Sequence, residues 1–155
     1  MKRVLVCGAT GFIGRNVVEA FAGRDDFQVA AVHNRRPPFE HDGVEWVEAD
    51  LTDRGDVSRV LEEADVVIQA AATTSGAGDI VNRPYIHVTD NAVMNALLFQ
   101  DAHDLAVDHV VFFSCTVMYP SSERALREED FTGEIEPNYF GVGWTKVYLE
   151  KLAEF

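Results

Sequence analysis

The sequence predicts an α/β protein built on a doubly wound parallel sheet of about five strands, in the order 3-2-1-4-5, with helices on both faces. Short apolar segments rich in β-branched residues alternate along the chain with amphipathic helical patterns, as in parallel strands joined by right-handed crossovers. Near-continuous apolar segments such as Asp65-Val66-Val67-Ile68 favour strands that are covered on both faces. A glycine-rich turn directly after the first apolar segment completes this pattern.

Five segments are predicted to be strands and four to be helices. The strands are Arg3–Cys7, Gln28–His33, Val44–Glu48, Ala64–Ala70 and His109–Ser114. The helices are Phe12–Ala22, Asp53–Glu63, Arg83–His103 and about Tyr139–Glu154. Turn-forming residues separate them, among them Ser75-Gly76-Ala77-Gly78. The longest irregular stretch, Pro120–Asn138, is acidic, and either an active-site rim or a solvated loop accounts for it.

Bulk properties exclude several classes of function. The 155 residues suit one domain with a core, and 47% hydrophobic with 25% charged residues is an ordinary globular composition. A net charge of −13 repels nucleic acid and anionic lipid, so we expect neither as a partner. No apolar segment approaches the ~20 residues of a membrane helix, and no secretory signal opens the chain. We therefore expect a cytoplasmic protein without a membrane partner.

The two cysteines are too few for a disulfide framework, and we expect no metal site. Cys7 ends the first apolar segment, and Cys115 follows the last one. In the predicted strand order one strand separates them, which sets them about 10 Å apart, beyond the ~7 Å limit for a bridge. We expect two free thiols, with Cys7 acting as a small buried hydrophobic residue.

Three glycines between the first strand and the first helix have the spacing G-x-x-G-x-x-G. Gly8 permits a tight turn, Gly11 lets the backbone approach a pyrophosphate, and Gly14 lets the helix lie close to the strand. Unpaired N–H groups of the first helical turn then face the phosphates. A purely structural turn is the alternative, and a site for another nucleotide is disfavoured because no Gly-Lys-Ser/Thr follows. The expected cofactor contacts here are Gly8, Thr10, Gly11, Phe12, Ile13 and Gly14.

With this turn and several later segments, the chain resembles the extended short-chain dehydrogenase/reductase family, the NAD(P)-dependent nucleotide-sugar epimerases, dehydratases and reductases. The resemblance implies a Rossmann fold in which Asp50, followed by Leu51, contacts the adenine amino group. It also implies that the small residues Ala70, Ala71 and Ala72 let the cofactor lie flat, and that Asn91 is the family's helix asparagine. The alternatives are a strand-ending Asp50, tight packing at the alanines and an ordinary polar helix position at Asn91.

The segment after the second strand favours NADP over NAD. An NAD site is expected to have an acidic residue about 20 positions beyond the glycine turn, where it binds the ribose hydroxyls. This chain has His33-Asn34-Arg35-Arg36 there. Since arginine binds phosphate through paired donors, Arg35 and Arg36 suit the 2′-phosphate of NADP. Solvated surface arginines, with NAD as the cofactor, are the alternative.

The resemblance further implies a Tyr-x-x-x-Lys pair, in which the lysine lowers the pKa of a tyrosine that exchanges a proton with the substrate. Lys146 is similar to that lysine, but Val142 stands where the tyrosine is expected. Tyr139 lies about 10 Å from Lys146 along a helix axis, unless Gly141 and Gly143 make the helix start irregularly. Tyr139 is therefore either the catalytic tyrosine or a packing residue, and Lys146 either a cofactor contact or a surface lysine.

The segment Ser114-Cys115-Thr116-Val117-Met118-Tyr119-Pro120 resembles the one that carries the family's catalytic hydroxyl, and is nearest to that of the GDP-fucose-synthase-like reductases. Cys115 stands where a serine or threonine is expected, and a thiol is a weaker hydrogen-bond donor than a hydroxyl. Thr116 and Ser114 flank it, and either could supply the hydroxyl if the strand end is shifted by one residue.

We therefore expect residues 1–155 to form an NAD(P)-binding Rossmann domain, truncated relative to a family whose members continue with a segment that grips the nucleotide-sugar. The expected function is an NADP-dependent oxidoreductase or epimerase of a nucleotide-sugar, or else a dinucleotide-binding module without turnover. An apolar stripe on the last helix packs either in the core or in a homodimer interface, which the resemblance places on the helices at 83–103 and 139–155. The stripe consists of Trp144, Tyr148, Leu152 and Phe155.

Overall fold

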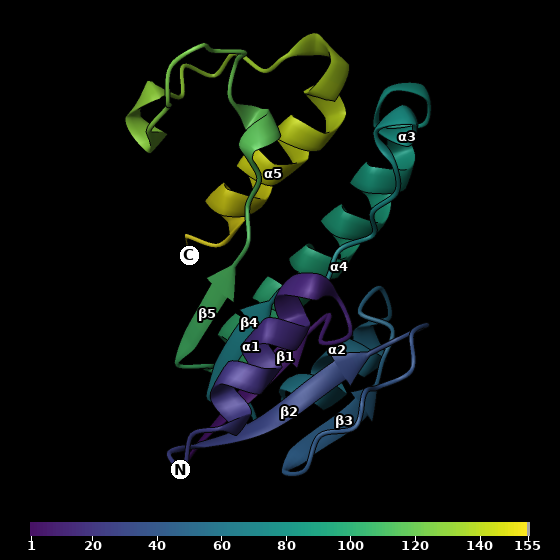
Figure 1. The fold of residues 1–155 in the computed structure, drawn as a ribbon, viewed down its shortest axis with the longest axis vertical. Coiled ribbons are helices and arrows are strands. Elements are labelled where there is room, and N and C mark those ends of the chain that lie inside the picture. The colour runs from purple at the N-terminus through teal and green to yellow at the C-terminus, as the bar shows by residue number, and fades with distance from the viewer. Residues whose placement is uncertain (155) are drawn as a thin grey trace. The chain divides into compact units, whose positions relative to one another are not determined.

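The computed structural model describes residues 1–154, which form a five-stranded sheet and five α-helices (Figure 1). The strands are β1 (Lys2–Cys7), β2 (Phe27–His33), β3 (Val44–Glu48), β4 (Val66–Gln69) and β5 (His109–Phe112). The helices are α1 (Phe12–Ala22), α2 (Arg54–Leu61), α3 (Ala77–Asn82), α4 (Tyr85–Asp104) and α5 (Phe140–Leu152). Between β5 and α5 lie the 3-10 turns η1 (Thr116–Met118), η2 (Glu128–Asp130) and η3 (Pro137–Tyr139). Phe155, predicted to end the apolar stripe, lies outside the described residues.

All strands of the sheet are parallel, and their order is β3-β2-β1-β4-β5. In the centre of the sheet, Leu5 of β1 pairs with Ala30 of β2 on one side and Val67 of β4 on the other. The predicted fold class and strand order are therefore confirmed.

The chain divides into two compact units. The first consists of residues 1–72 and 97–113 and contains the sheet with α1 and α2. The second consists of residues 73–96 and of the chain from residue 114 onward, and contains α3, α5 and the three 3-10 turns. Helix α4 contributes residues to both units.

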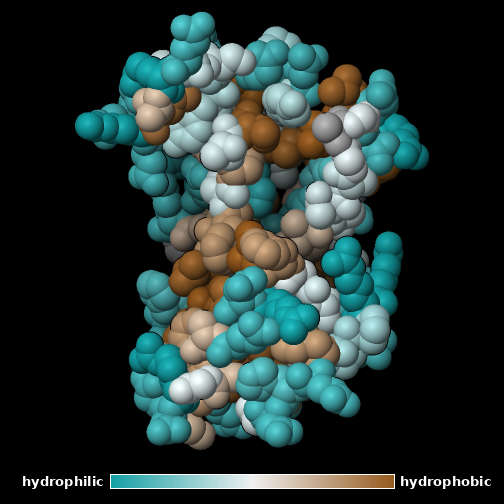
Figure 2. Space-filling view, in the orientation of Figure 1, coloured by the Kyte–Doolittle hydropathy of each residue, from teal (hydrophilic) through white to brown (hydrophobic). Residues whose placement is uncertain are grey.

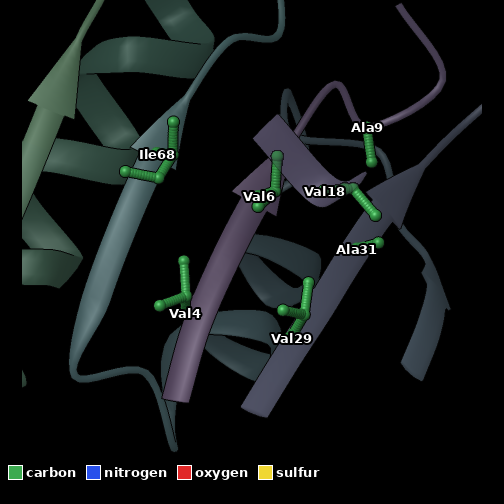
Figure 3. Packing of buried hydrophobic residues seen from close by; sticks show 7 residues of the cluster. All are labelled: Val4, Val6, Ala9, Val18, Val29, Ala31 and Ile68. Atoms are coloured by element: carbon green, nitrogen blue, oxygen red, sulfur yellow. The ribbon is translucent and has the colours of Figure 1, made fainter. Parts of the chain in front are cut away.

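The core of the first unit is built from small and β-branched side chains on one face of the sheet. Figure 3 shows seven of them gathered between β1, β2, β4 and α1. They are Val4, Val6, Ala9, Val18, Val29, Ala31 and Ile68. Leu5 and Val67 alternate with these residues along their strands and are equally buried, so the sheet is covered on both faces. Figure 1 accordingly shows α1 in front of the sheet and α2 behind it.

Hydrophilic residues cover most of the face of the molecule in Figure 2, with hydrophobic residues showing between them. This surface agrees with the 26 acidic residues of the sequence, which outnumber the 13 lysines and arginines. No helix among residues 1–154 is long and apolar enough to cross a membrane.

The structure contains one helix, α3, that the sequence pattern did not indicate. This six-residue helix contains Gly78 and has no apolar periodicity, and an ion pair of 2.6 Å between Asp79 and Arg83 spans it. Helix α4 begins at Tyr85 rather than at Arg83 as predicted. The reason is local, since Arg83 precedes Pro84 and a residue before proline is disfavoured in the helical conformation.

Two strands are shorter than predicted. β4 ends at Gln69 rather than at Ala70, whose N–H is shared between the carbonyls of Cys7 and Ile68, both at 3.2 Å. β5 ends at Phe112 rather than at Ser114, so Ser114 and the residues after it belong to the second unit.

The two glycines at the ends of α1 give a test of how closely this helix packs. A Cβ at Gly14 would lie 2.2 Å from the backbone oxygen of Gly8, whereas at Gly23 its nearest neighbour would be 3.9 Å away. We expect Gly14→Ala to lower the free energy of unfolding by more than about 2 kcal/mol, because backbone cannot yield to the methyl group. Gly23→Ala is the control and should change it by less than about 1 kcal/mol. Urea denaturation of the two variants makes the comparison, and equal effects would contradict the packing described here.

Candidate functional site

The turn between β1 and α1 depends on a glycine at position 8 for two separate reasons. Gly8 has a φ of +70°, in the left-handed region that other residues avoid. A Cβ there would also lie 2.6 Å from the Cα of Ala71, just beyond the end of β4. Any side chain at this position would therefore push β1 and the chain after β4 apart.

The other two glycines of the motif pack around the carbonyl of Gly8. The N–H of Gly11 donates to that oxygen at 2.9 Å, and a Cβ at Gly11 would lie 3.2 Å from it. At Gly14 the distance would be only 2.2 Å. We call this arrangement of Gly8, Gly11 and Gly14 the glycine knot. It brings the first turn of α1 against the end of β1 and leaves no room for a side chain between them.

The amino end of α1 is open to an anion. Gly11 occupies the N-cap position and has no side chain with which to cap the helix. Phe12 is 88% exposed and Ile13 45% exposed, while Thr10 is half-buried. First-turn N–H groups have no intrahelical acceptor and carry the positive end of the helix dipole. The knot and the uncapped helix therefore fit a diphosphate group.

Asp50 lies at the carboxyl end of β3 as an exposed, ionised carboxylate. Its Oδ1 accepts hydrogen bonds from the N–H of Thr52 at 2.9 Å and from the Thr52 hydroxyl at 2.7 Å. These bonds, a hydrogen bond from Asn34 and the charge of Arg35 hold the pKa of Asp50 below its ordinary value. The carboxylate is thus fixed in direction beside the chain that follows β2. Leu51, its predicted companion, is buried and points into the core.

Arg35 and Arg36 follow β2 on that same chain, and both side chains are exposed. Within residues 1–154 neither guanidinium forms an ion pair shorter than 4.0 Å, although the charge of Arg35 acts on Asp50. Both are therefore able to bind a further anion. Their predicted contact with a 2′-phosphate stays a prediction.

The three alanines after β4 are involved in close packing. The N–H of Ala70 donates to the carbonyl of Cys7 at 3.2 Å, which continues the contact between β4 and β1. The N–H of Ala71 donates to Oε1 of Gln69 at 3.1 Å, and its backbone lies against Gly8. Ala72 is exposed. Packing explains the small size of Ala71, and close approach of a flat ring to all three stays a prediction.

In the second unit, Asn91 fixes the chain that follows β4. Its Oδ1 accepts from the N–H of Thr73 at 3.0 Å, and its Nδ2 donates to the carbonyls of Thr73 at 2.8 Å and His87 at 2.7 Å. Asn91 is 6% exposed, and these three bonds satisfy most of the hydrogen-bonding capacity of its amide group. Asn91 therefore positions Thr73, and a direct contact with a cofactor stays a prediction.

Sequence reasoning missed two further polar residues on the same face of α4. His87 is 6% exposed and its Nε2 lies 2.9 Å from the hydroxyl of Ser75. Asn95 is 1% exposed and donates to the carbonyl of Asn91 at 2.7 Å. The spacing of positions 87, 91 and 95 by four residues was the available signal, since it puts three polar side chains on one helix face.

Lys146 of α5 and Cys115 lie close enough for their charges to interact. Burial lowers the pKa of Lys146, because it disfavours the ammonium form, and Cys115 and Glu150 oppose this shift. Burial also raises the pKa of the Cys115 thiol, and Lys146 opposes that shift. Cys7 is wholly buried, which raises its pKa to about 12. Both cysteines are free, as predicted.

Tyr139 precedes α5 rather than belonging to it. It is the last residue of the turn η3 and the N-cap of α5, and its N–H donates to the carbonyl of Glu136 at 2.8 Å. Gly141 and Gly143 lie inside α5, and the 3-10 turn η3 leads directly into this helix. The two glycines serve packing, because a Cβ at Gly143 would lie 2.7 Å from Ile135. The catalytic role of Tyr139 stays a prediction.

A hollow of about 470 Å³ lies in the second unit beside Thr116, the candidate catalytic hydroxyl. Its wall combines hydroxyl groups, guanidinium groups and the ring of Tyr119. The lining residues are Thr116, Tyr119, Pro120, Ser122, Arg124, Leu126, Arg127 and Glu128.

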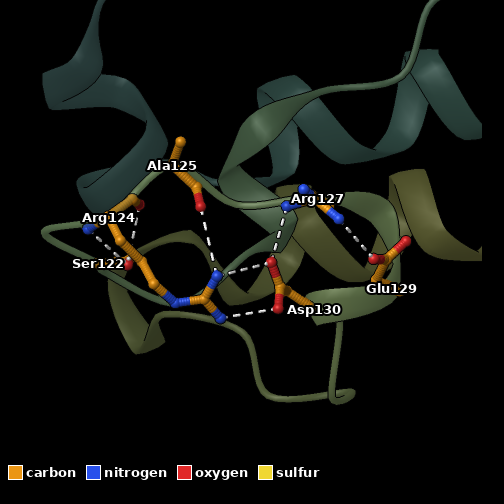
Figure 4. Close-up of polar contacts among 6 residues, drawn as sticks. All are labelled: Ser122, Arg124, Ala125, Arg127, Glu129 and Asp130. Carbon is orange, nitrogen blue, oxygen red and sulfur yellow. Dashed lines mark hydrogen bonds and ion pairs between the residues drawn. The ribbon is translucent and has the colours of Figure 1, made fainter.

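The predicted irregular stretch supplies most of the wall of this hollow, and its role as an active-site rim stays a prediction. In Figure 4 the guanidinium of Arg124 forms two bonds to the carboxylate of Asp130, at 2.7 and 3.1 Å. That carboxylate also accepts from the N–H of Arg127 at 2.8 Å. Asp130 thereby holds the guanidinium of Arg124 and the backbone of Arg127.

Trp144 and Tyr148 of the predicted apolar stripe are 41% and 56% exposed, and Phe140 is 61% exposed. Core packing is therefore wrong as an explanation for the first two. Leu152 is half-buried. Among residues 1–154, no group of three or more His, Cys, Asp or Glu side chains is arranged to hold a metal ion.

Comparison with known proteins agrees with this geometry. The dTDP-L-rhamnose 4-epimerase of Burkholderia thailandensis is 32% identical over 144 residues, which cover 84% of this chain and 39% of that enzyme. The GDP-L-fucose synthase of Sinorhizobium fredii is 27% identical over 159 residues, which cover 99% of this chain and 46% of that enzyme. This chain thus spans less than half the length of either relative.

Solved structures share the fold. The UDP-glucose 4-epimerase of Thermus thermophilus, solved in complex with NAD, has a TM-score of 0.80 and 26% identity, and the match covers 96% of this chain and 49% of that one. The UDP-Glc/GlcNAc 4-epimerase of Campylobacter jejuni has a TM-score of 0.82 and 18% identity, covering 98% and 48%. The model of the NAD dependent epimerase/dehydratase family matches residues 4–154. This chain belongs to the NAD dependent epimerase/dehydratase family.

Proposed function

We propose that this chain binds NADP(H) and takes part in the oxidation–reduction of a nucleotide-sugar, as an epimerase or a reductase. The glycine knot carries the proposal, because it presents uncapped N–H groups at the amino end of α1 without a covering side chain. When bound, the nicotinamide ring of such a cofactor gives or takes a hydride. The names of the relatives support the nucleotide-sugar as substrate class.

The residues that would hold the cofactor come from three strand ends. The knot and the first turn of α1 would bind the diphosphate, and the fixed carboxylate of Asp50 would accept a hydrogen bond from the adenine amino group. Arg35 and Arg36 would bind the 2′-phosphate, since no carboxylate stands at this position to repel it. In the second unit, Lys146 would bind a ribose hydroxyl.

Proton transfer would use the polar side chains of the second unit. Since burial favours the neutral amine of Lys146, this group can hold or release a proton nearer to neutral pH than an exposed lysine. The hydroxyl of Thr116, the thiol of Cys115 and the phenol of Tyr139 are the candidate partners. The hollow beside Thr116 would receive the sugar, because its hydroxyl groups and aromatic face suit a polyhydroxylated ring.

A second function, dinucleotide binding without turnover, is favoured by the place of Tyr139 before α5 and by Val142 at the expected tyrosine position. The two functions differ in turnover alone. Turnover of any kind would exclude the binding-only function. Loss of absorbance at 340 nm with NADPH and a 4-keto sugar nucleotide reports reduction, a gain with NADP+ and the corresponding alcohol reports oxidation, and ¹H NMR of the sugar nucleotide reports epimerisation, which consumes no cofactor overall.

The cofactor assignment is tested by parallel calorimetric titration with NADPH and NADH. We expect NADPH to bind at least about tenfold more tightly, a difference of ~1.4 kcal/mol. The double variant Arg35→Ala with Arg36→Ala should lose this preference and keep its affinity for NADH. Tighter binding of NADH by the unchanged chain would contradict the choice of NADP, and binding of neither would contradict the proposed function.

Lys146 can be tested against matched controls in the same chain, because Lys2 and Lys151 are its only other lysines. Ion pairs with Asp108 and Glu154 raise the pKa of these two exposed lysines, whereas burial lowers that of Lys146. We expect the amine of Lys146 to lose its proton at the lowest pH of the three. NMR titration after ¹³C-methylation of the amines measures this, and a Lys146 that titrates with the others would remove the argument for its role.

We further propose a homodimer formed through the helices at 83–103 and 139–154. The exposed rings of Phe140, Trp144 and Tyr148 on α5 support it, since large aromatic side chains are enriched in interfaces. Sedimentation velocity should show a dimer that Trp144→Asp converts to a monomer. Lys151→Asp, an exposed position on the same helix, is the control. A monomeric unchanged chain would contradict this arrangement.

A further inference from the structure

Arg15 in the first turn of α1 holds its guanidinium over an aromatic ring. Its Cζ lies 4.5 Å from the centre of the Phe39 ring, and its Nε donates to Glu19 at 2.8 Å. The side chain of Arg15 is 56% exposed. Stacking occupies the face of the guanidinium and leaves N–H groups at its edge, which is the arrangement in which arginine binds phosphate.

Phe39 belongs to the chain between β2 and β3 that also carries Arg35 and Arg36. Its ring packs edge-on against Trp46 of β3, with centres 4.8 Å apart, and against the core of the first unit. Phe39 is therefore a fixed support. Because Arg15 rests on it, the guanidinium of Arg15 is held over the connection that begins with the two predicted phosphate-binding arginines.

The position of Arg15 along α1 fits the same ligand. Arg15 begins the helical hydrogen-bonding of α1, since its N–H donates to the carbonyl of Gly11 at 2.9 Å. The proposed diphosphate site is therefore one turn away in the backbone, while the side chain reaches toward the carboxyl end of β2. In this fold the adenosine ribose lies between these two places.

We propose that Arg15 is a third arginine of the cofactor site and binds the 2′-phosphate of NADP together with Arg35 and Arg36. The inference rests on the proposed function and adds a specificity-determining residue to it. The ion pair of Arg15 with Glu19 does not oppose this role, because both side chains are about half exposed and such a pair is weak. In a chain of net charge −13, three arginines around one position supply the local charge that an extra phosphate requires.

Arg24 provides a matched control in the same unit. Its guanidinium stacks 4.8 Å from the ring centre of Phe27 and pairs with Asp26 at 2.8 Å, and its side chain is also 56% exposed. The two arginines differ in their location. Phe27 begins β2, whereas Arg15 lies over Phe39, whose ring packs on Trp46, the partner of Ala31 in the second half of that strand. Arg15→Ala and Arg24→Ala therefore both remove an exposed arginine that lies over an aromatic ring. Only Arg15→Ala removes one that lies near the proposed cofactor site.

The test is the calorimetric affinity of Arg15→Ala, Arg15→Lys and Arg24→Ala for NADPH and NADH. We expect Arg15→Ala to bind NADPH about tenfold more weakly (~1.4 kcal/mol) and NADH within about twofold of the unchanged chain. The affinity of Arg15→Lys for NADPH should lie between those of Arg15→Ala and the unchanged chain, because lysine keeps the charge and loses the planar fork. Arg24→Ala should bind both as before. Thermal unfolding of each variant shows that it is folded.

Two outcomes would overturn the role of Arg15 alone. Equal weakening of NADPH and NADH by Arg15→Ala would make it a support of the fold, and unchanged affinity for both would make it a surface residue. An unchanged chain that binds neither dinucleotide would instead contradict the proposed function, and with it the role of Arg15. The unchanged chain therefore separates the two failures.

Discussion

The structure depends on the contact between the first turn of α1 and the carbonyl of Gly8. Three glycines surround this one oxygen, and a methyl group at Gly8 or Gly14 would meet backbone atoms at 2.6 or 2.2 Å. Such a contact can be made only by backbone, so the amino end of the helix is left without a side-chain cap. The requirement for packing and the requirement for binding an anion are therefore met by the same residues, and a substitution that relaxes one also removes the other.

The two units supply different chemistry. In the first unit the candidate contacts are backbone N–H groups and exposed charges at strand ends, which bind without needing a change of protonation. In the second unit the candidates are a half-buried amine, a half-buried thiol and hydroxyl groups, whose proton affinities depend on burial. Departures from the family's pattern, Cys115 and Val142, fall only in the second unit. A chain of this family can therefore lose turnover and keep cofactor binding, so binding and turnover have to be measured in separate experiments.

Local patterns sufficed for the sheet, because continuous apolar segments and a glycine turn are properties of neighbouring residues. Local patterns did not predict the features that depend on contacts between residues apart in the sequence. Helix α3 contains Gly78, follows another glycine and has no apolar period, yet Asp79 and Arg83 form an ion pair along it. The exposure of Trp144 depends on what packs against α5, which its own spacing does not reveal. The hollow beside Thr116 likewise depends on Asp130 reaching back to Arg124, six residues earlier, in a stretch without periodicity.

Cofactor preference is the property least transferable from the relatives. In the proposed function the glycine knot binds the diphosphate, which NAD and NADP have in common, and a solved relative with this fold holds NAD. The two cofactors differ in one phosphate group on the adenosine ribose, which this fold places near the end of β2. A carboxylate there would repel that phosphate, and a guanidinium would attract it. This chain has Arg35 and Arg36 there. The nearby carboxylate of Asp50 accepts hydrogen bonds from Thr52 and Asn34. Since the whole chain is strongly acidic, attraction cannot come from a distance and has to come from such nearby charges. We therefore expect the choice between the cofactors to depend on a few exposed side chains rather than on the sheet itself.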